Sequence, residues 1–177
     1  MLRFLQSDFG DFPMPSLQIL LIDWADGMEY YGATTTGSSS LSHELVHMYW
    51  GTSAVGRTWR DTWLDEAIVT WWEQTQLRGK HIAPIPRRYT SDMVSGRNAI
   101  EPAFDLSAYG KGARIVSALA ERVGGEAALI ELLAAIHRAR AFAPFSTVDF
   151  IDDLVAATGD DSIRDSMKRW LFGKVKT

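Results

Sequence analysis

The sequence predicts one α+β domain in which a small β-sheet is followed by a mainly helical part. Residues Ser16–Asp23 are apolar and rich in branched side chains between two prolines and a turn at Asp26-Gly27, a pattern that favours a strand. From Ser38 onward, apolar residues recur at helical spacing between capping residues and glycines. With 177 residues, 46% of them hydrophobic, the chain can bury one sizeable core. We expect a β-rich part over about residues 1–37 and a helical part over about 38–177.

The two predicted strands differ in their surroundings. Ser16–Asp23 has the continuous apolar character of a buried strand. Tyr30–Thr36 is more polar and is expected to be an edge strand. An unpaired edge of this kind can hold an extended peptide by strand addition, with little demand on the sequence of the peptide.

The predicted helices begin at capping residues and end at glycines. The first follows Ser38–Ser40 and runs to about Trp50, and the second begins at Asp61 or Thr62 and ends before Gly79. Proline and glycine between His81 and Pro102 predict an irregular loop. Four further helices are expected over Ser107–Val123, Ala127–Arg138, Val148–Ala157 and Ile163–Leu171. Five tryptophans lie around the first two helices, and most of them are expected in the core: Trp50, Trp59, Trp63, Trp71 and Trp72.

Composition excludes several classes of function. The net charge of −4 and the lack of a Lys/Arg cluster argue against a nucleic-acid surface. The longest apolar run, Ile19–Ile22, is too short to cross a bilayer, so no membrane partner is expected for this segment. The chain has no cysteine, which excludes disulfides and a thiolate nucleophile. We expect a soluble protein, with the cytoplasm slightly favoured; the sequence does not indicate an oligomeric state.

The pentapeptide His43-Glu44-Leu45-Val46-His47 is the most informative motif. Residues four apart share one face of a helix, so His43 and His47 can direct both imidazoles to one metal ion, about 2.0–2.1 Å from each nitrogen. Glu44 projects beside the ion, where a base for a metal-activated water is needed. The motif therefore predicts a zinc hydrolase site with Glu44 as the general base.

A third ligand is predicted at Glu66, which follows His47 after eighteen intervening residues. A catalytic zinc site uses three protein ligands and one open position, and Glu66 offers a carboxylate on the second helix. We therefore expect one Zn²⁺ per chain, held by His43, His47 and Glu66. The remaining histidines, His81 and His137, lie outside this pattern and are expected at the surface or at the edge of the core.

The stretch from His43 to Glu73 resembles the core of the aminopeptidase N family of gluzincin zinc metallopeptidases. After the zinc-binding helix that family has a Trp, an Asp and then Trp-Leu-Asn-Glu-Gly. This sequence has Trp59, Asp61 and Trp63-Leu64-Asp65-Glu66-Ala67. Asp65 in place of Asn and Ala67 in place of Gly depart from the pattern, and neither removes a metal ligand. The Ala67 side chain is expected to affect how closely this helix approaches the metal.

The resemblance implies roles for three further residues. Gly27-Met28-Glu29 is similar to the family's Gly-Ala-Met-Glu-Asn loop, which implies that Glu29 receives the free α-amino group of the substrate. Tyr109, in Phe104–Ala113, resembles the tyrosine of the family's Tyr-Glu-Lys-Gly-Ala segment, whose hydroxyl donates to the oxyanion. Glu73 also matches and lies on the same helical face as Glu66, so we expect it to orient a ligand histidine.

The resemblance spans nearly the whole chain, from Phe9 to Leu171. It implies a thermolysin-like zincin catalytic domain, with the domains that normally flank it in the family absent from this sequence. The implied function is an aminopeptidase that uses a zinc-activated water, Glu44 as base and Tyr109 as oxyanion donor, acting on peptides with a free N-terminus. Two alternatives remain: a gluzincin endopeptidase, which needs no amine anchor, and a zinc-binding fragment or scaffold without catalysis.

Overall fold

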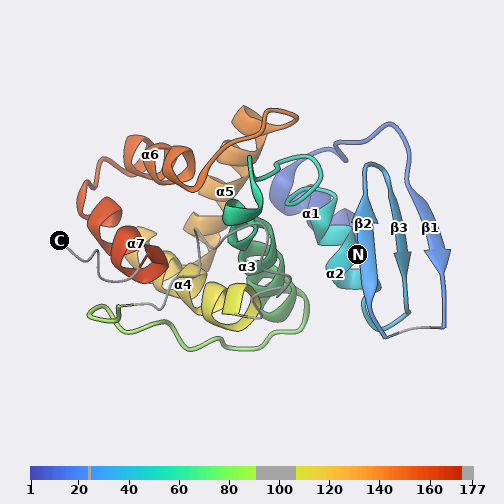
Figure 1. Ribbon diagram of the computed structural model, residues 1–177, viewed down its shortest axis with the longest axis horizontal. Coiled ribbons are helices and arrows are strands. Elements are labelled where there is room, and N and C mark those ends of the chain that lie inside the picture. The colour runs from blue at the N-terminus through green and yellow to red at the C-terminus, as the bar shows by residue number, and fades with distance from the viewer. Residues whose placement is uncertain (24, 91–106, 173–177) are drawn as a thin grey trace.

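A small β-sheet and a bundle of helices lie side by side in the computed structural model of the protein, which describes residues 1–23, 25–90 and 107–172 (Figure 1). Helices α2 and α3 lie where the two parts meet. The helices and strands are α1 (Leu2–Phe9), β1 (Gln18–Leu21), β2 (Gly27–Tyr30), β3 (Ala33–Thr36), α2 (Leu41–His47), the 3-10 turn η1 (Trp59–Asp61), α3 (Trp63–Trp72), the π-helical turn η2 (Glu73–Leu77), α4 (Ser107–Val123), α5 (Glu126–Arg140), α6 (Thr147–Thr158) and α7 (Ser162–Phe172). The α+β class is confirmed. None of the helices in the described ranges is long and apolar enough to cross a membrane.

The sheet has three strands in the order β1-β3-β2, with β1 parallel and β2 antiparallel to the central β3. Strands β2 and β3 are joined by a turn at Tyr31-Gly32, where Gly32 adopts a φ of 67° that favours glycine. The prediction of an edge strand over Tyr30–Thr36 is therefore wrong. Ala33–Thr36 is the central strand, and its Thr34 and Thr36 side chains are buried toward α2. The edge strand next to the helices is β2.

Strand β1 lies within the predicted Ser16–Asp23 segment, but the prediction that it is buried is wrong. All four of its residues are exposed; Leu20 and Leu21 each keep 59% of their surface. The reason is its position at the outer edge of the sheet, where only β3 pairs with it among the described residues. An apolar run alone does not distinguish this edge from a central strand.

Helix α2 is shorter than predicted, because it ends at His47 rather than near Trp50. The chain turns there: the Thr52 hydroxyl and backbone N–H both donate to the His47 carbonyl, and Gly51 has a φ of 126°. The N-cap is Ser40, as expected, although its hydroxyl donates to the Ala25 carbonyl and accepts no hydrogen bond from a backbone N–H of the helix. This bond ties the start of α2 to the segment before β2.

Helix α3 is the buried centre of the molecule and packs extensively against α4. Gly112 of α4 allows this approach, since a Cβ built there would lie only 2.6 Å from the Cβ of Ala67. The side chain at position 67 therefore limits how closely α3 and α4 pack beside the site, and its expected effect on the approach of α3 to the metal stays a prediction. At its end α3 widens into η2, a π-helical turn of the kind often found at functional sites.

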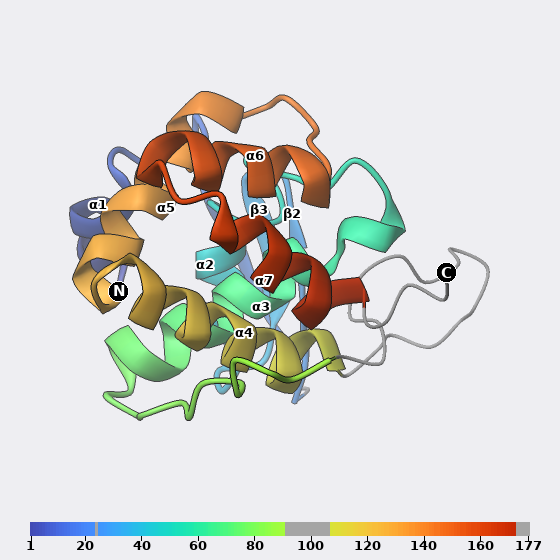
Figure 2. The ribbon, with the colours of Figure 1, turned by 90° about the vertical axis from the view of Figure 1, so that its left-hand side faces the viewer.

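The C-terminal helices follow the sequence prediction closely. The helix over Ser107–Val123 is confirmed, and α5, α6 and α7 extend the predicted segments by one or two residues (Figure 2). Ser146 caps α6 in a capping box with Asp149. The predicted loop from His81 is irregular up to residue 90, and the rest of it lies outside the described residues. His81 is exposed as expected, whereas His137 is buried and bonded to Ser53 at 2.9 Å.

Candidate metal centre

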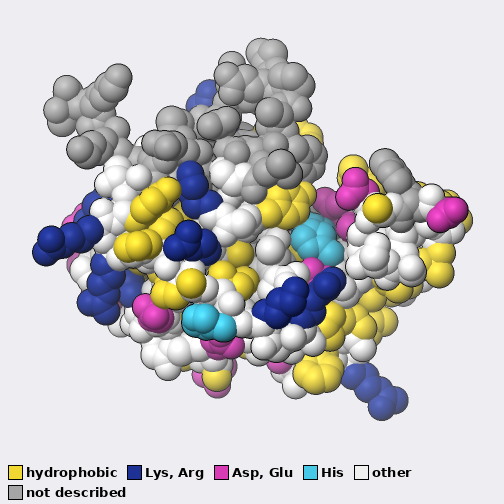
Figure 3. Space-filling view, turned by 90° about the horizontal axis from the view of Figure 1, so that it is seen from below, with side chains coloured by type: hydrophobic (Ala, Val, Ile, Leu, Met, Phe, Trp, Pro, Cys, Tyr) yellow, Lys and Arg dark blue, Asp and Glu magenta, His cyan; other side chains and the backbone are white. Residues whose placement is uncertain are grey.

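A cleft of about 960 Å³ opens between the sheet and the helical part. Its walls come from β2, α2, the segment Gly51–Thr62, α3 and the start of α4. On the face shown in Figure 3, histidine surface (cyan) is visible in a hollow beside carboxylates (magenta). All seven residues predicted for the site line this cleft, namely Glu29, His43, Glu44, His47, Glu66, Glu73 and Tyr109.

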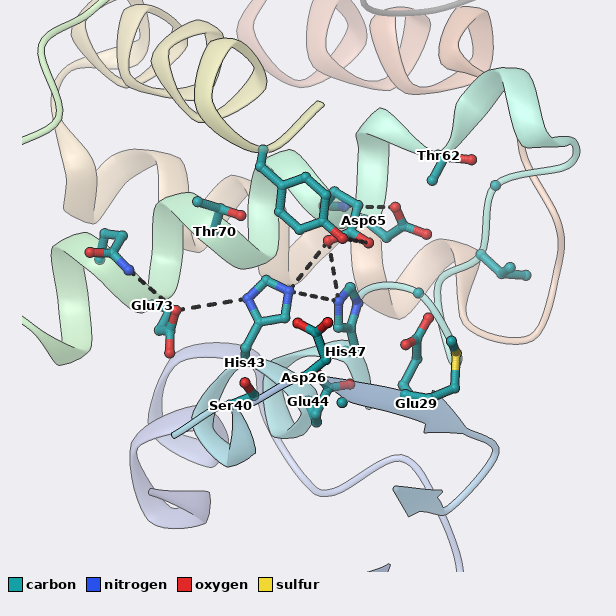
Figure 4. A pocket seen from close by; sticks show the side chains of 18 of the residues that line it. Asp26, Glu29, Ser40, His43, Glu44, His47, Thr62, Asp65, Thr70 and Glu73 are labelled. Atoms are coloured by element: carbon teal, nitrogen blue, oxygen red, sulfur yellow. Dashed lines mark hydrogen bonds and ion pairs between the residues drawn. The ribbon is translucent and has the colours of Figure 1, made fainter. Parts of the chain in front are cut away.

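His43, His47 and Glu66 converge on one point (Figure 4). The Nε2 atoms of His43 and His47 are 3.1 Å apart, and Oε2 of Glu66 lies 3.3 Å from the first and 3.5 Å from the second. Ligands about 2.0–2.1 Å from a tetrahedral zinc ion are about 3.3 Å from one another. The three separations therefore fit the edges of one face of a zinc tetrahedron, and two imidazoles with one carboxylate are a donor set that suits zinc.

The ring orientation of each histidine is set by its other nitrogen. Nδ1 of His47 lies 2.9 Å from the Trp50 carbonyl, an acceptor that requires a proton on Nδ1 and leaves the Nε2 lone pair for a metal. Nδ1 of His43 faces Oε2 of Glu73 at 3.8 Å. The early end of α2 is what turns the Trp50 carbonyl back to the ring. Both imidazoles thus present Nε2 to the shared point.

Glu66 is held by the neighbouring helix α4. The hydroxyl of Tyr109 donates to its Oε1 at 2.7 Å, which leaves Oε2 directed at the two histidines. Burial would raise the pKa of Glu66, but hydrogen bonds from His43 and His47 outweigh it and lower the pKa to about 2. Burial would likewise lower the pKa of His47, and the bond to Glu66 instead raises it to about 10. The negative charge of the Glu66 carboxylate therefore stabilises a positive charge at the cluster, either a proton on a histidine or a metal ion.

Glu44 is buried on α2, with 4% of its surface exposed. Its Oε2 has no hydrogen-bond partner within the described ranges. Burial raises the pKa of Glu44 to about 7, against the opposing charges of His47 and His43. A buried carboxylate oxygen left unpaired beside a metal-binding cluster is suited to accept a proton from a small polar molecule such as water.

Glu29 and Glu73 lie at opposite ends of the site. Glu29 is half-buried on β2 and pairs in register with the buried Thr34, so its side chain is on the sheet face turned toward α2. Glu73 is buried at the start of η2, on the His43 side. Figure 4 shows the two carboxylates on either side of the histidine pair.

Two residues that sequence reasoning did not identify hold Glu73 in place. Ser42 and Arg78 both donate to its Oε1, the latter at 2.9 Å. Burial would raise the pKa of Glu73, but the bonds from His43, Ser42 and Arg78 lower it to about 2. Ser42 stands next to a predicted ligand in the sequence. Arg78 reaches the site only because η2 continues α3 as a π-helical turn, which no local pattern signals.

The fold and the cluster define a zincin-like α+β domain with a zinc-type donor set, and the comparisons agree. Aminopeptidase M1 of Arabidopsis thaliana is 24% identical over 199 residues, covering 90% of this chain and 22% of that protein. The alanine/arginine aminopeptidase of Saccharomyces cerevisiae is 23% identical over 209 residues, covering 90% and 24%. The chain thus spans about a quarter of the length of these curated relatives. No family model matches the sequence.

Solved structures give the same result. The M1 zinc metallopeptidase from Deinococcus radiodurans superimposes with a TM-score of 0.74 at 26% identity, covering 99% of this chain and 43% of that one. The leukotriene A4 hydrolase of Saccharomyces cerevisiae gives a TM-score of 0.79 at 18% identity, covering 98% and 34%. The predicted resemblance to the aminopeptidase N-like zinc metallopeptidases is therefore confirmed, and zinc is the cofactor that these relatives imply.

Proposed function

We propose that this chain is the zinc-binding catalytic domain of an aminopeptidase, which hydrolyses the first peptide bond of a substrate with a free N-terminus. The observation that carries the proposal is the convergence of Nε2 of His43, Nε2 of His47 and Oε2 of Glu66 at tetrahedral separations, next to the unpaired carboxylate of Glu44. The names of the sequence relatives, which are aminopeptidases, support the same reaction class.

His43, His47 and Glu66 hold the metal, and Glu73 orients the His43 ring. When bound, zinc polarises the scissile carbonyl and lowers the pKa of water toward about 7. Glu44 accepts the proton of the attacking water and passes it to the leaving amine. Its burial supports this role, because a carboxyl group with a pKa near neutrality can both take and release a proton at the working pH.

Tyr109 stabilises the oxygen that becomes negative when the carbonyl is attacked. Its hydroxyl already donates toward the cluster, at Oε1 of Glu66, so a small rotation of the side chain redirects the same donor to a substrate oxygen. A well-placed donor of this type contributes about 2.7–4 kcal/mol to stabilising the transition state.

Glu29 binds the substrate ammonium by a charge-assisted hydrogen bond and thereby fixes the cleaved bond one residue from the N-terminus. This residue separates an aminopeptidase from an endopeptidase with the same metal chemistry. Its half-buried position on the cleft side of β2 supports the aminopeptidase assignment.

The proposal is tested with a panel of aminoacyl chromogenic amides with free and N-acetylated termini, with zinc measured on the same sample. We expect one zinc per chain and hydrolysis of the free amines only. A Glu66→Gln variant should lose both zinc and activity. Stoichiometric zinc with no hydrolysis of any substrate would point to the scaffold alternative, and equal hydrolysis of blocked peptides would point to the endopeptidase.

A further inference from the structure

Trp59 differs from the other tryptophans that surround the two metal-binding helices. Trp50, Trp63, Trp71 and Trp72 are at most 1% exposed, as expected for core residues, whereas Trp59 keeps 71% of its surface exposed. It also lines the cleft. A large aromatic side chain left in water beside a candidate active site offers an apolar surface that a ligand can cover.

Hydrogen bonds fix the backbone of the turn that carries Trp59. Asp61 is 7% exposed and accepts four hydrogen bonds, from the backbone and hydroxyl of Thr58 at 3.3 and 3.0 Å and from those of Thr147 at 2.8 and 2.7 Å. The Thr62 hydroxyl donates to the Trp59 carbonyl at 2.7 Å. These bonds fix the backbone of η1 to the start of α6, and the Trp59 indole therefore projects from a rigid turn.

The turn lies on the same side of the metal-binding cluster as Glu29. The segment Gly51–Thr62 begins four residues after His47, and a Cβ built at Gly51 would lie 2.8 Å from Nδ1 of the His47 ring. Glu29 lies on β2 and lines the cleft, whereas Nδ1 of His43 faces Oε2 of Glu73 at 3.8 Å. Figure 4 shows Glu29 and Thr62 on one side of the histidines and Glu73 on the other.

The positions of Glu29 and Glu73 on opposite sides of the histidines define the direction in which a peptide would lie in the cleft. If Glu29 holds the α-ammonium, the first residue of the peptide occupies the His47 side of the cleft, and the rest of the chain leaves over His43 toward Glu73. Val55 and Trp59 line the cleft on the segment between His47 and Thr62, and we expect this wall beside the side chain of the first residue. Arg57, in the same wall, presents a positive charge and is paired with Asp149 at 3.1 Å.

We propose that Trp59 is a specificity-determining residue whose indole packs against the side chain of the first substrate residue. The preferred substrates are peptides with a large apolar N-terminal residue, aromatic or aliphatic. An apolar wall binds such a side chain by removing it from water, whereas a basic side chain would lose hydration against the same surface without gaining a partner there. This inference rests on the proposed function, because it takes Glu29 as the anchor of the N-terminus.

The test compares kcat/KM for the p-nitroanilides of phenylalanine, alanine and arginine in the zinc-loaded protein. We expect Trp59→Ala to lower the ratio of the phenylalanine to the alanine substrate by about three- to tenfold, the range of one aromatic contact, and Trp59→Phe to retain most of it. Tyr31→Ala, which removes another exposed aromatic residue outside the cleft, is the matched control and should leave the ratio unchanged.

Binding of non-hydrolysed amines separates this inference from the proposed function. Calorimetric titration with phenylalanine amide and alanine amide should show tighter binding of the former, and Trp59→Ala should reduce the difference even if no substrate is cleaved. An unchanged phenylalanine-to-alanine ratio in Trp59→Ala in both measurements would overturn the role of Trp59. An arginine substrate that depends on Trp59 as strongly as phenylalanine does would overturn the apolar class.

Discussion

The hydroxyl of Tyr109 donates a 2.7 Å hydrogen bond to Oε1 of Glu66, and so joins the proposed oxyanion donor to a proposed metal ligand. The bond exists because α3 and α4 approach closely where Ala67 meets Gly112, one residue after Glu66 and three after Tyr109. With Oε1 occupied by the tyrosine, Glu66 presents a single oxygen to the histidines. One packing contact therefore sets the geometry of both groups.

Replacing Tyr109 with Phe tests both parts of this relationship. We expect kcat to fall by about 10²-fold or more, because the donor to the developing oxyanion is lost, while KM changes little. Zinc affinity should fall by no more than about tenfold, since Glu66 loses one orienting bond but keeps its charge. Steady-state kinetics and a chelator competition assay measure the two effects. Equal losses in kcat and in substrate affinity would indicate a packing role instead.

Replacing Glu44 with Gln is expected to separate metal binding from catalysis. The amide has nearly the same shape but cannot accept the proton of the attacking water, so kcat should fall by about 10²- to 10⁴-fold. Zinc content should stay at one per chain, because Glu44 is not among the converging ligands. Substantial residual activity in the zinc-loaded variant would remove Glu44 from the chemistry.

Replacing Glu29 with Ala should harm only substrates with a free N-terminus. Loss of a charge-assisted hydrogen bond costs about 1.5–3 kcal/mol, which corresponds to about a 10- to 150-fold decrease in kcat/KM. The N-acetylated peptide is measured beside the free amine, and its low baseline rate should not fall further, so the preference for the free amine should shrink. If the preference for free over acetylated peptides is unchanged, the amine is bound elsewhere.

The burial of His137 is expected to make the folded protein less stable in mild acid, independently of the metal centre. It is buried, its Nδ1 has no partner in the described part of the chain, and burial lowers its pKa to about 4. The unfolded chain therefore binds a proton near pH 6.5 that the folded chain does not, so the contribution is complete above pH 6.5 and is lost as the pH falls toward 4. We expect a loss on the order of 1–3 kcal/mol in the free energy of unfolding.

Urea unfolding between pH 7.5 and 4.5 checks this prediction. His137→Gln can retain a bond to Ser53 and should show a weaker pH dependence than the original chain. His81→Gln alters an exposed histidine and is the control, with an unchanged profile expected. If the His137→Gln and original profiles have the same slope, the acid sensitivity arises from other groups.

The sequence predicted which residues gather in the cleft more completely than it predicted the sheet, for physical reasons; the roles of these residues stay predictions. The spacing of His43 and His47 fixes two ligands on one helical turn, and a short helix leaves few other arrangements for them. The strand pattern carries no such constraint. An apolar run such as Ile19–Leu21 is consistent with either a central or an edge strand, and only pairing with a distant segment decides between them.

Features that depend on the path of the backbone were missed. Helix α1 begins at the N-terminus without a capping signal, and the contact between Arg78 and Glu73 requires a π-helical turn. The exposure of Trp59 also depends on the path of the backbone and was not predicted. Its position among buried tryptophans favours the core, yet the capping box of Thr58 and Asp61 turns its indole outward.

The exposed edge of β1 has a practical consequence for work with this chain. Natural sheet edges are often protected against joining one another by lysine, proline or a bulge, and Gln18–Leu21 contains neither a charged residue nor a proline. At high concentration, such an edge is prone to aggregation through intermolecular strand pairing. We expect Leu20→Lys, which lies outside the cleft, to reduce this pairing, because a charged side chain on an edge strand opposes it.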